Sequence, residues 1–187
     1  MRWLYASLDV RAFRSSYAFE FAEFCLLIAL SFGIPLIMGH PQVYVGTLVN
    51  TFLVISALNL GARQVIFLSL IPSVSALLRG VLFGPFTPAL AFMLPFIWVG
   101  NIILILAIKA LFIEKKINYA VSLFIGALAK SSFLFASALA LFNFGFVPAL
   151  FLSAMGVMQF ATALAGGVLA YFIWKVVERF VGFKIKG

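Results

Sequence analysis

Two basic residues, Arg79 and Lys130, lie in otherwise apolar stretches of the sequence, and no acidic residue is placed to neutralise them at a similar depth. An ionisable group inside hydrocarbon is costly and usually faces a cavity, a partner or a pathway. Lys130 falls at the middle of its stretch, too far from either interface to reach water easily. Arg79 lies near the end of its stretch, so it could contact a ligand or simply extend to the surface. Cations without a neighbouring carboxylate suit an anionic or carboxylate-bearing ligand.

Amide and aromatic side chains in neighbouring stretches could complete such a site. Asn101 and Gln159 could orient a ligand or hydrogen-bond across helices, and the sequence favours neither role; for Asn59 and Gly166, helix packing is the better interpretation. Aromatic residues cluster around the connections expected at the outer side. They could form an interfacial belt or stack on a flat ring of the ligand. These residues are Phe83, Phe86, Phe92, Phe96, Trp98, Phe144 and Phe146.

We therefore predict a substrate site in the segment 83–95 and the spans beside it. Its expected residues are Arg79, Phe86, Phe96, Asn101, Lys130 and Gln159. One alternative stays open for Lys130, which could lie too deep to touch the ligand and be held by backbone carbonyls or by Ser131. A site of this kind, without a buried acid, argues against a proton or sodium antiporter.

Motifs for catalysis or nucleotide binding are missing from the sequence. There is no HExxH, P-loop, GxSxG or paired-carboxylate pattern, so we expect neither an enzyme nor an autonomous ATPase, and no cofactor. His40 stands in a turn without a Cys, an Asp or a second His nearby, so we expect no metal site.

Composition indicates the elements that must position these residues. Of the 187 residues, 65% are hydrophobic, and the mean hydropathy is +1.21, which is far too apolar for a soluble monomer. A span needs about 20 mainly apolar residues. We predict an all-α integral membrane protein with six transmembrane helices, at 19–38, 43–60, 65–82, from between 88 and 95 to about 112, 119–142 and 149–177.

Local features refine this prediction. Pro72 is expected to break the third span early. The segment 84–88 cannot be regular helix, because each of its two prolines removes a donor and constrains its predecessor. The sixth span is longer than the bilayer is thick, so it must tilt, kink or project.

The distribution of charge predicts the orientation. The net charge is +8, but nucleic-acid binding needs a basic stripe on a water-facing surface. Here the basic residues lie beside apolar spans, and even numbers of spans separate their clusters. The positive-inside rule therefore makes both termini cytoplasmic. These basic residues are Arg2, Arg11, Arg14, Arg63, Lys109, Lys115, Lys116, Lys175, Arg179, Lys184 and Lys186.

One transmembrane domain accounts for most of the chain. We expect a basic cytoplasmic or interfacial segment at 1–18, which could form a short amphipathic helix, the six-helix domain at 19–177, and a basic cytoplasmic tail at 178–187. Glu20 and Glu23 suit the N-terminus of the first span. Membrane lipid is the expected surrounding, and no nucleic-acid partner is expected.

Small residues repeat every four positions along the first span, at Cys25, Ala29 and Gly33. This spacing lets another helix pack closely. The stripe could pack within the bundle, or it could be the docking site for a separate membrane subunit.

Four stretches also carry a family resemblance: GTLVN at 46–50, LIPS at 70–73, LPFI at 94–97 followed by Gly100 and Asn101, and ALAGG at 163–167. With six short-looped spans, they resemble the S components of energy-coupling factor (ECF) transporters, over most of the region 19–177. The family often has an Ala-xxx-Ala docking pattern in its first helix; here Cys25, Ala29 and Gly33 keep the small size but not the identity.

The resemblance implies the substrate-capturing subunit of an ATP-driven importer for a vitamin or similar micronutrient. Such a subunit binds its small-molecule substrate near the outer face, in a prokaryotic cell membrane (inner or plasma membrane). It docks on a transmembrane T component that couples to an ATPase pair. The main alternative is a self-contained secondary transporter or channel that acts as a homo-oligomer, for which we locate no coupling-ion site. A small membrane enzyme or an assembly factor are further alternatives.

Overall fold

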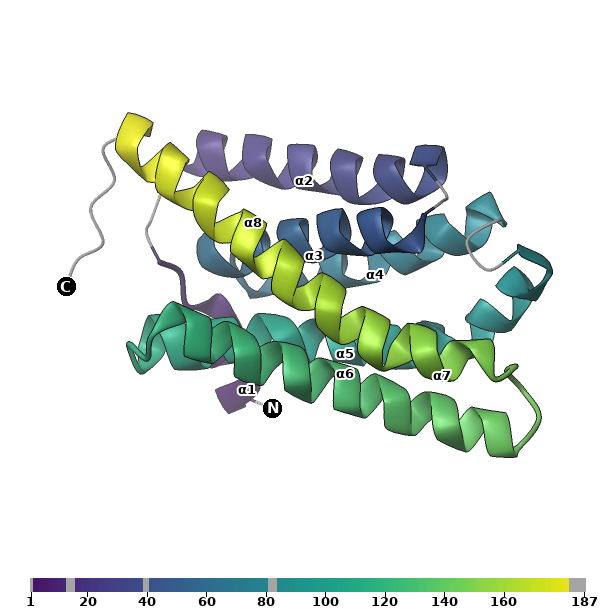
Figure 1. Cartoon of the computed structure of the whole chain (residues 1–187). Helices are drawn as coiled ribbons and strands as arrows, with labels where there is room; N and C mark the ends of the chain where they lie inside the picture. Colours follow the sequence, from purple (N-terminus) through teal and green to yellow (C-terminus); the bar gives the residue numbers. More distant parts are fainter. Residues whose placement is uncertain (1, 13–15, 39–40, 81–83, 182–187) are drawn as a thin grey trace.

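The computed structural model describes residues 2–12, 16–38, 41–80 and 84–181. In these residues the chain forms helices and no strand (Figure 1). In chain order they are α1 (Arg2–Asp9), α2 (Tyr17–Met38), α3 (Gln42–Asn59), α4 (Ala62–Arg79), the 3-10 helix η1 (Gly84–Ala89), α5 (Leu90–Ala107), the π-helical turn η2 (Ile108–Glu114), α6 (Tyr119–Asn143), α7 (Leu150–Met155) and α8 (Val157–Val181).

Six helical segments in the described part of the chain are long and apolar enough to cross a membrane. They are Tyr17–Met38, Gln42–Asn59, Ala62–Arg79, Gly84–Glu114, Tyr119–Asn143 and Leu150–Arg179, with mean hydropathies from 1.2 to 2.4. The protein is therefore an all-helical, multi-pass membrane protein, and the prediction of six spans is confirmed. The side of the membrane on which the termini lie stays a prediction.

Residues that suit helix ends set the boundaries of these helices. The Gln64 side chain accepts a hydrogen bond from the Gly61 N–H at 2.9 Å, which satisfies a donor at the start of α4. The same helix ends at Gly80, whose φ of +74° suits glycine best. At the start of α6, the Asn118 side chain accepts from the Ala120 N–H at 2.9 Å.

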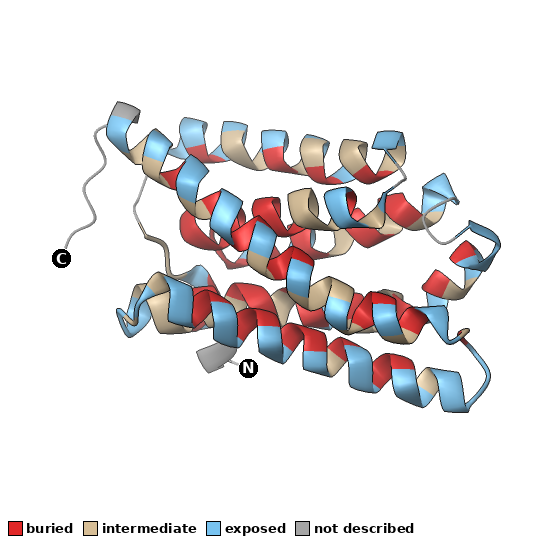
Figure 2. Cartoon of the chain, viewed as in Figure 1, coloured by how far each residue is buried: buried red, intermediate tan, exposed pale blue. Residues whose placement is uncertain are grey.

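Small residues allow α8 to pack closely against α3, which is the most extensive helix pairing in the bundle. Ala163, Gly166 and Ala170 of α8 are buried on one face. A side chain at Gly166 would bring a Cβ atom 2.5 Å from the Thr47 carbonyl oxygen of α3, so only glycine permits this approach. Figure 2 shows the resulting burial, which is low along α2 and high along α3.

The sixth span is divided into two helices. α7 and α8 meet at Gly156, whose φ of −91° and ψ of −100° are not helical. Beyond it, α8 crosses the bundle obliquely (Figure 1). The prediction that this long segment must tilt or kink is confirmed.

Two predictions from proline were wrong. α4 is continuous from Ala62 to Arg79 although Pro72 lies inside it; within a membrane protein, neighbouring helices and polar side chains can satisfy the groups that a proline frees. The segment after 83 is also not irregular. It forms the 3-10 helix η1, in which the Thr87 hydroxyl donates to the Gly84 carbonyl at 2.9 Å.

The N-terminal segment packs onto one end of the bundle, close to the turn between α3 and α4 and to η2. Ala12 N–H donates to the Leu58 carbonyl at 2.7 Å, and Arg11 forms an ion pair with Glu20 at the start of α2. Lys109 is fully buried beneath this segment, where its amine donates to the carbonyls of Val10 and Leu60. We call this the basic end of the bundle. The expected N-terminal helix exists as α1.

Candidate ligand-binding cavity

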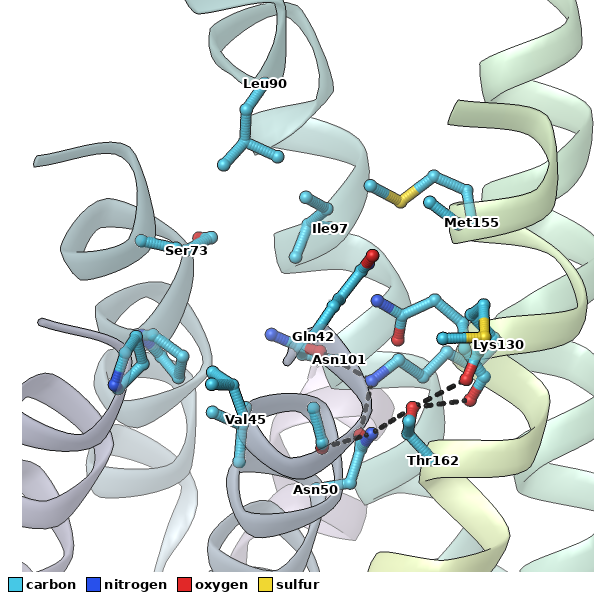
Figure 3. Close-up of a pocket in the computed structure, with 18 residues that line it drawn as sticks. Gln42, Val45, Asn50, Ser73, Leu90, Ile97, Asn101, Lys130, Met155 and Thr162 are labelled. Atoms are coloured by element: carbon cyan, nitrogen blue, oxygen red, sulfur yellow. Dashed lines mark hydrogen bonds between the residues drawn. The ribbon is translucent and has the colours of Figure 1, made fainter. Parts of the chain in front are cut away.

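A cavity lies in the half of the bundle opposite the basic end, between α3, α4, α5, α6, α7 and α8, with Pro35 of α2 at its edge. It contains about 660 Å³ of empty space when the part open to the surroundings is counted. Figure 3 shows Lys130 beside Asn50, Asn101 and Thr162, with the apolar side chains of Leu90, Ile97 and Met155 farther along the space. The polar residues that line it are Gln42, Asn50, Ser73, Asn101, Lys130, Gln159 and Thr162.

Lys130 is the only charged residue among those that line the cavity. It projects from the middle of α6 and is 2% exposed. Its amine donates to the side-chain oxygen of Asn50 at 2.6 Å and to that of Asn101 at 2.9 Å (Figure 3). A lysine amine carries three donors when charged, and no described residue accepts from the third. The idea that backbone carbonyls or Ser131 hold this lysine is wrong: the Ser131 hydroxyl donates to Leu128.

The two asparagines are themselves fixed by hydrogen bonds from their amide nitrogens. Asn50 donates to the Gly46 carbonyl at 2.9 Å and to the Thr162 hydroxyl at 3.2 Å. Asn101 donates to the Ser69 carbonyl at 2.8 Å. These bonds turn both amide oxygens toward the lysine, so the network is pre-organised before any ligand binds. It connects five helices, from α3 to α6 and α8.

Two further side-chain amides line the cavity and have no hydrogen-bond partner in the described part of the chain. Gln42, at the start of α3, and Gln159, near the start of α8, are both half-buried and line the cavity. Neither side chain forms a hydrogen bond with another described residue. Each can therefore donate and accept without breaking an existing contact.

Apolar side chains form the greater part of the wall. Met155 and Met158, on either side of the break at Gly156, belong to it, and methionine adapts its shape to irregular contents. The other apolar lining residues are Pro35, Val45, Val49, Pro72, Ala76, Leu90, Ile97 and Ala154. A molecule that fills this space would meet one basic group, several amides and an extended apolar surface.

The structure brings together three of the predicted substrate-site residues, Asn101, Lys130 and Gln159. The other three do not line the cavity. Arg79 is exposed at the last turn of α4, and Phe86 is 50% exposed on η1.

Phe96, the third predicted residue outside the cavity, packs against a hydrophobic cluster that includes Leu134 and Phe151. Its ring centroid lies 6.4 Å from that of Phe133. Of the segment 83–95, Leu90 reaches the cavity, and Phe83 lies outside the described residues.

Sequence reasoning missed Asn50 and Gln42 as cavity residues, and it treated Lys109 only as a flanking charge. Asn50 could have been predicted from the sequence, because it lies at the middle of its span, at a depth similar to that of Lys130. Gln42 and Lys109 lie at span ends, where depth alone does not separate a buried polar group from an exposed one.

The stripe of small residues on α2 faces away from the bundle. Cys25 and Ala29 are exposed, and a Cβ atom added at Gly33 would meet nothing within 4 Å. Packing inside this chain therefore does not account for their small size. Asn59, in contrast, does bridge two helices, since its amide donates to Glu23 of α2.

No metal-binding group stands out in the described part of the chain: no three His, Cys, Asp or Glu side chains gather there. His40 lies outside the described residues.

Comparison with known proteins gives no match: no family model, no curated protein and no solved structure is significantly similar to this chain.

Proposed function

We propose that this chain captures a small, acidic, partly apolar compound in the cavity at Lys130 and acts as the S component of an ECF-type importer. The observation that carries the proposal is the buried amine of Lys130, which lines an otherwise mostly apolar cavity with no acidic residue. An anionic group beside this amine would stabilise its charged form. In return, the amine would give the anion a short, charge-assisted hydrogen bond.

The remaining polar groups suit the recognition of such a compound. Asn50 and Asn101 hold the amine in place, while the free amides of Gln42 and Gln159 can bind further polar atoms of the ligand. Because the apolar wall is larger than the polar one, we propose a carboxylate-bearing molecule with an apolar body. A vitamin or similar micronutrient that carries a carboxylate would suit such a site.

The S-component role also rests on the outward-facing stripe on α2. Cys25, Ala29 and Gly33 leave a shallow, open surface on the least buried of the six spans. A helix of a transmembrane T component could approach closely there, and its ATPase pair would supply the energy. In this proposal the basic end is cytoplasmic, the cavity belongs to the outer half of a prokaryotic cell membrane, and the chain itself is not an enzyme.

Identification of the small molecules that co-purify with the protein tests the capture proposal. The protein would be purified in detergent and analysed by native mass spectrometry, alongside Lys130→Met and Lys115→Met. Both variants lose one positive charge, but Lys115 is exposed in the turn after η2. We expect an acidic ligand on the native protein and on Lys115→Met and its loss from Lys130→Met, whose folding is checked by thermal unfolding.

Two results would count against the proposal. Equal ligand retention by a folded Lys130→Met variant would remove the lysine from the site. A bound ligand without any acidic group would leave the cavity as a binding site but remove its anion preference.

A further inference from the structure

A second hollow lies at the basic end, between the turn that joins η2 to α6 and the segment 168–175 of α8. We call it the interfacial groove and define it by six of its lining residues: Phe112, Lys116, Tyr119, Tyr171, Trp174 and Lys175. It shares no lining residue with the cavity at Lys130.

Aromatic rings form the wall of the interfacial groove. The ring centroids of Tyr119 and Tyr171 lie 4.7 Å apart, and Phe112 packs edge-on against Tyr119 at 5.2 Å and against Trp174 at 6.2 Å. Such a cluster holds its shape because each ring is fixed by its neighbours. The groove is therefore pre-formed.

Two lysines stand at this wall. The Lys175 amine lies 5.0 Å from the centroid of the Trp174 ring and forms an ion pair with Glu178 at 2.8 Å. Lys116 is exposed and has no ion-pair partner among the described residues. Within residues 2–12, 16–38, 41–80 and 84–181, only the charge of Lys175 is thus neutralised.

A buried donor in the same wall has no hydrogen-bond partner among the described residues. Trp174 is 2% exposed, and its indole N–H forms no hydrogen bond. A buried donor without a partner is unfavourable by an amount comparable to a lost hydrogen bond. Because the indole nitrogen is enclosed by its neighbours, the group that the groove offers to an oxyanion is the exposed Lys116 amine.

Apolar residues continue from the groove along the outer face of α8. Val168 and Phe172 line the groove and are 49% and 63% exposed; on a membrane-spanning helix such side chains face hydrocarbon. A soluble phosphate would use only the charged part of this surface, whereas a phospholipid would use both parts. Basic pockets between helices at the membrane surface are typical sites for anionic lipid headgroups.

We infer that the interfacial groove binds an anionic phospholipid, with its phosphate at Lys116 and Lys175, beside the Trp174 ring, and an acyl chain along Val168 and Phe172. The bound lipid would thereby connect α8 to the turn before α6. This site is independent of the ligand proposed at Lys130.

Native mass spectrometry of the whole protein tests this inference. The protein would be released from bilayers that contain equal parts of phosphatidylcholine and phosphatidylglycerol, and the retained lipids would be identified. We expect selective retention of phosphatidylglycerol, weakened roughly fivefold by each of Lys116→Gln and Lys175→Gln. Arg63→Gln is the matched control, because Arg63 is an exposed basic residue at the same end but outside the groove. It should leave retention unchanged.

A second measurement does not depend on the lysine variants. In the native protein, phosphatidylglycerol with brominated acyl chains should quench tryptophan fluorescence more strongly than brominated phosphatidylcholine does, and Trp174→Phe should remove this difference. Equal quenching by the two lipids would overturn the inference. So would equal loss of retention in Arg63→Gln, or displacement of the lipid by glycerol phosphate alone, which would indicate a site for a soluble phosphate.

Discussion

Replacement of Asn50 by aspartate tests how the cavity would recognise an acidic ligand. The substitution keeps the shape of the side chain and places a carboxylate oxygen where an amide oxygen now accepts from the Lys130 amine at 2.6 Å. A ligand carboxylate bound to the same amine, at about 2.8 Å as in other charge-assisted bonds, would lie at most about 5–6 Å from the new charge. At an effective dielectric constant of about 20, two like charges at that separation repel by about 3 kcal/mol.

We therefore expect Asn50→Asp to bind the acidic ligand roughly 100-fold more weakly. The assay is isothermal titration with the ligand identified by co-purification and with its neutral primary amide. The amide carries no charge, so its affinity should change far less than that of the acid. Asn50→Leu serves as the uncharged control, because it removes the acceptor without adding a negative charge.

The variant also loses the bond from the Asn50 amide nitrogen to the Gly46 carbonyl, so its thermal unfolding must be measured alongside. Equal losses of affinity for the acid and the amide would refute the reasoning. They would mean that the cavity binds its ligand by shape and neutral hydrogen bonds, with no anionic group near Lys130.

Three further predictions concern docking, packing and topology. Ala29→Trp should abolish association with a membrane partner while leaving ligand binding intact; co-purification of an unchanged complex would contradict this. Gly166→Ala should destabilise the bundle by about 1–3 kcal/mol, because the added Cβ atom would lie 2.5 Å from a carbonyl oxygen of α3. Gly33→Ala is the control: its added Cβ atom would meet nothing within 4 Å, so the temperature of thermal unfolding should not change. In a cysteine-free background, Gly145→Cys should react with an impermeant thiol reagent in intact cells and Lys116→Cys should not, because α6 spans the membrane between them; labelling of the latter would reverse the proposed orientation.

The spans could be predicted from the sequence because hydropathy is averaged over about 20 residues and tolerates local exceptions. The prediction failed where single residues were judged without this averaging. Pro72 and the prolines after Gly84 were judged by their local effect on the backbone, but α4 continues through Pro72 and the segment 84–89 forms a 3-10 helix.

Part of the candidate cavity was also predictable. Lys130, Asn101 and Gln159 were identified because polar residues deep in an apolar span must face other protein groups or a cavity. Arg79 shows the limit of this argument: at the last turn of its helix, the direction of a side chain depends on helix rotation, and the structure leaves it exposed. The hydrogen bond between Asn50 and Lys130 could not be predicted, because it depends on how α3 and α6 are placed relative to each other. The sequence of a single span does not specify that placement.

Transport by the isolated chain tests the central claim most directly. The purified protein would be reconstituted alone into liposomes, and equilibrium binding and uptake of its identified ligand would be measured in the same preparation, with and without proton and sodium gradients. Our account predicts saturable binding that is weakened by Lys130→Met, and no accumulation of ligand against its gradient. Accumulation driven by either ion gradient would contradict it and would favour a self-contained secondary transporter.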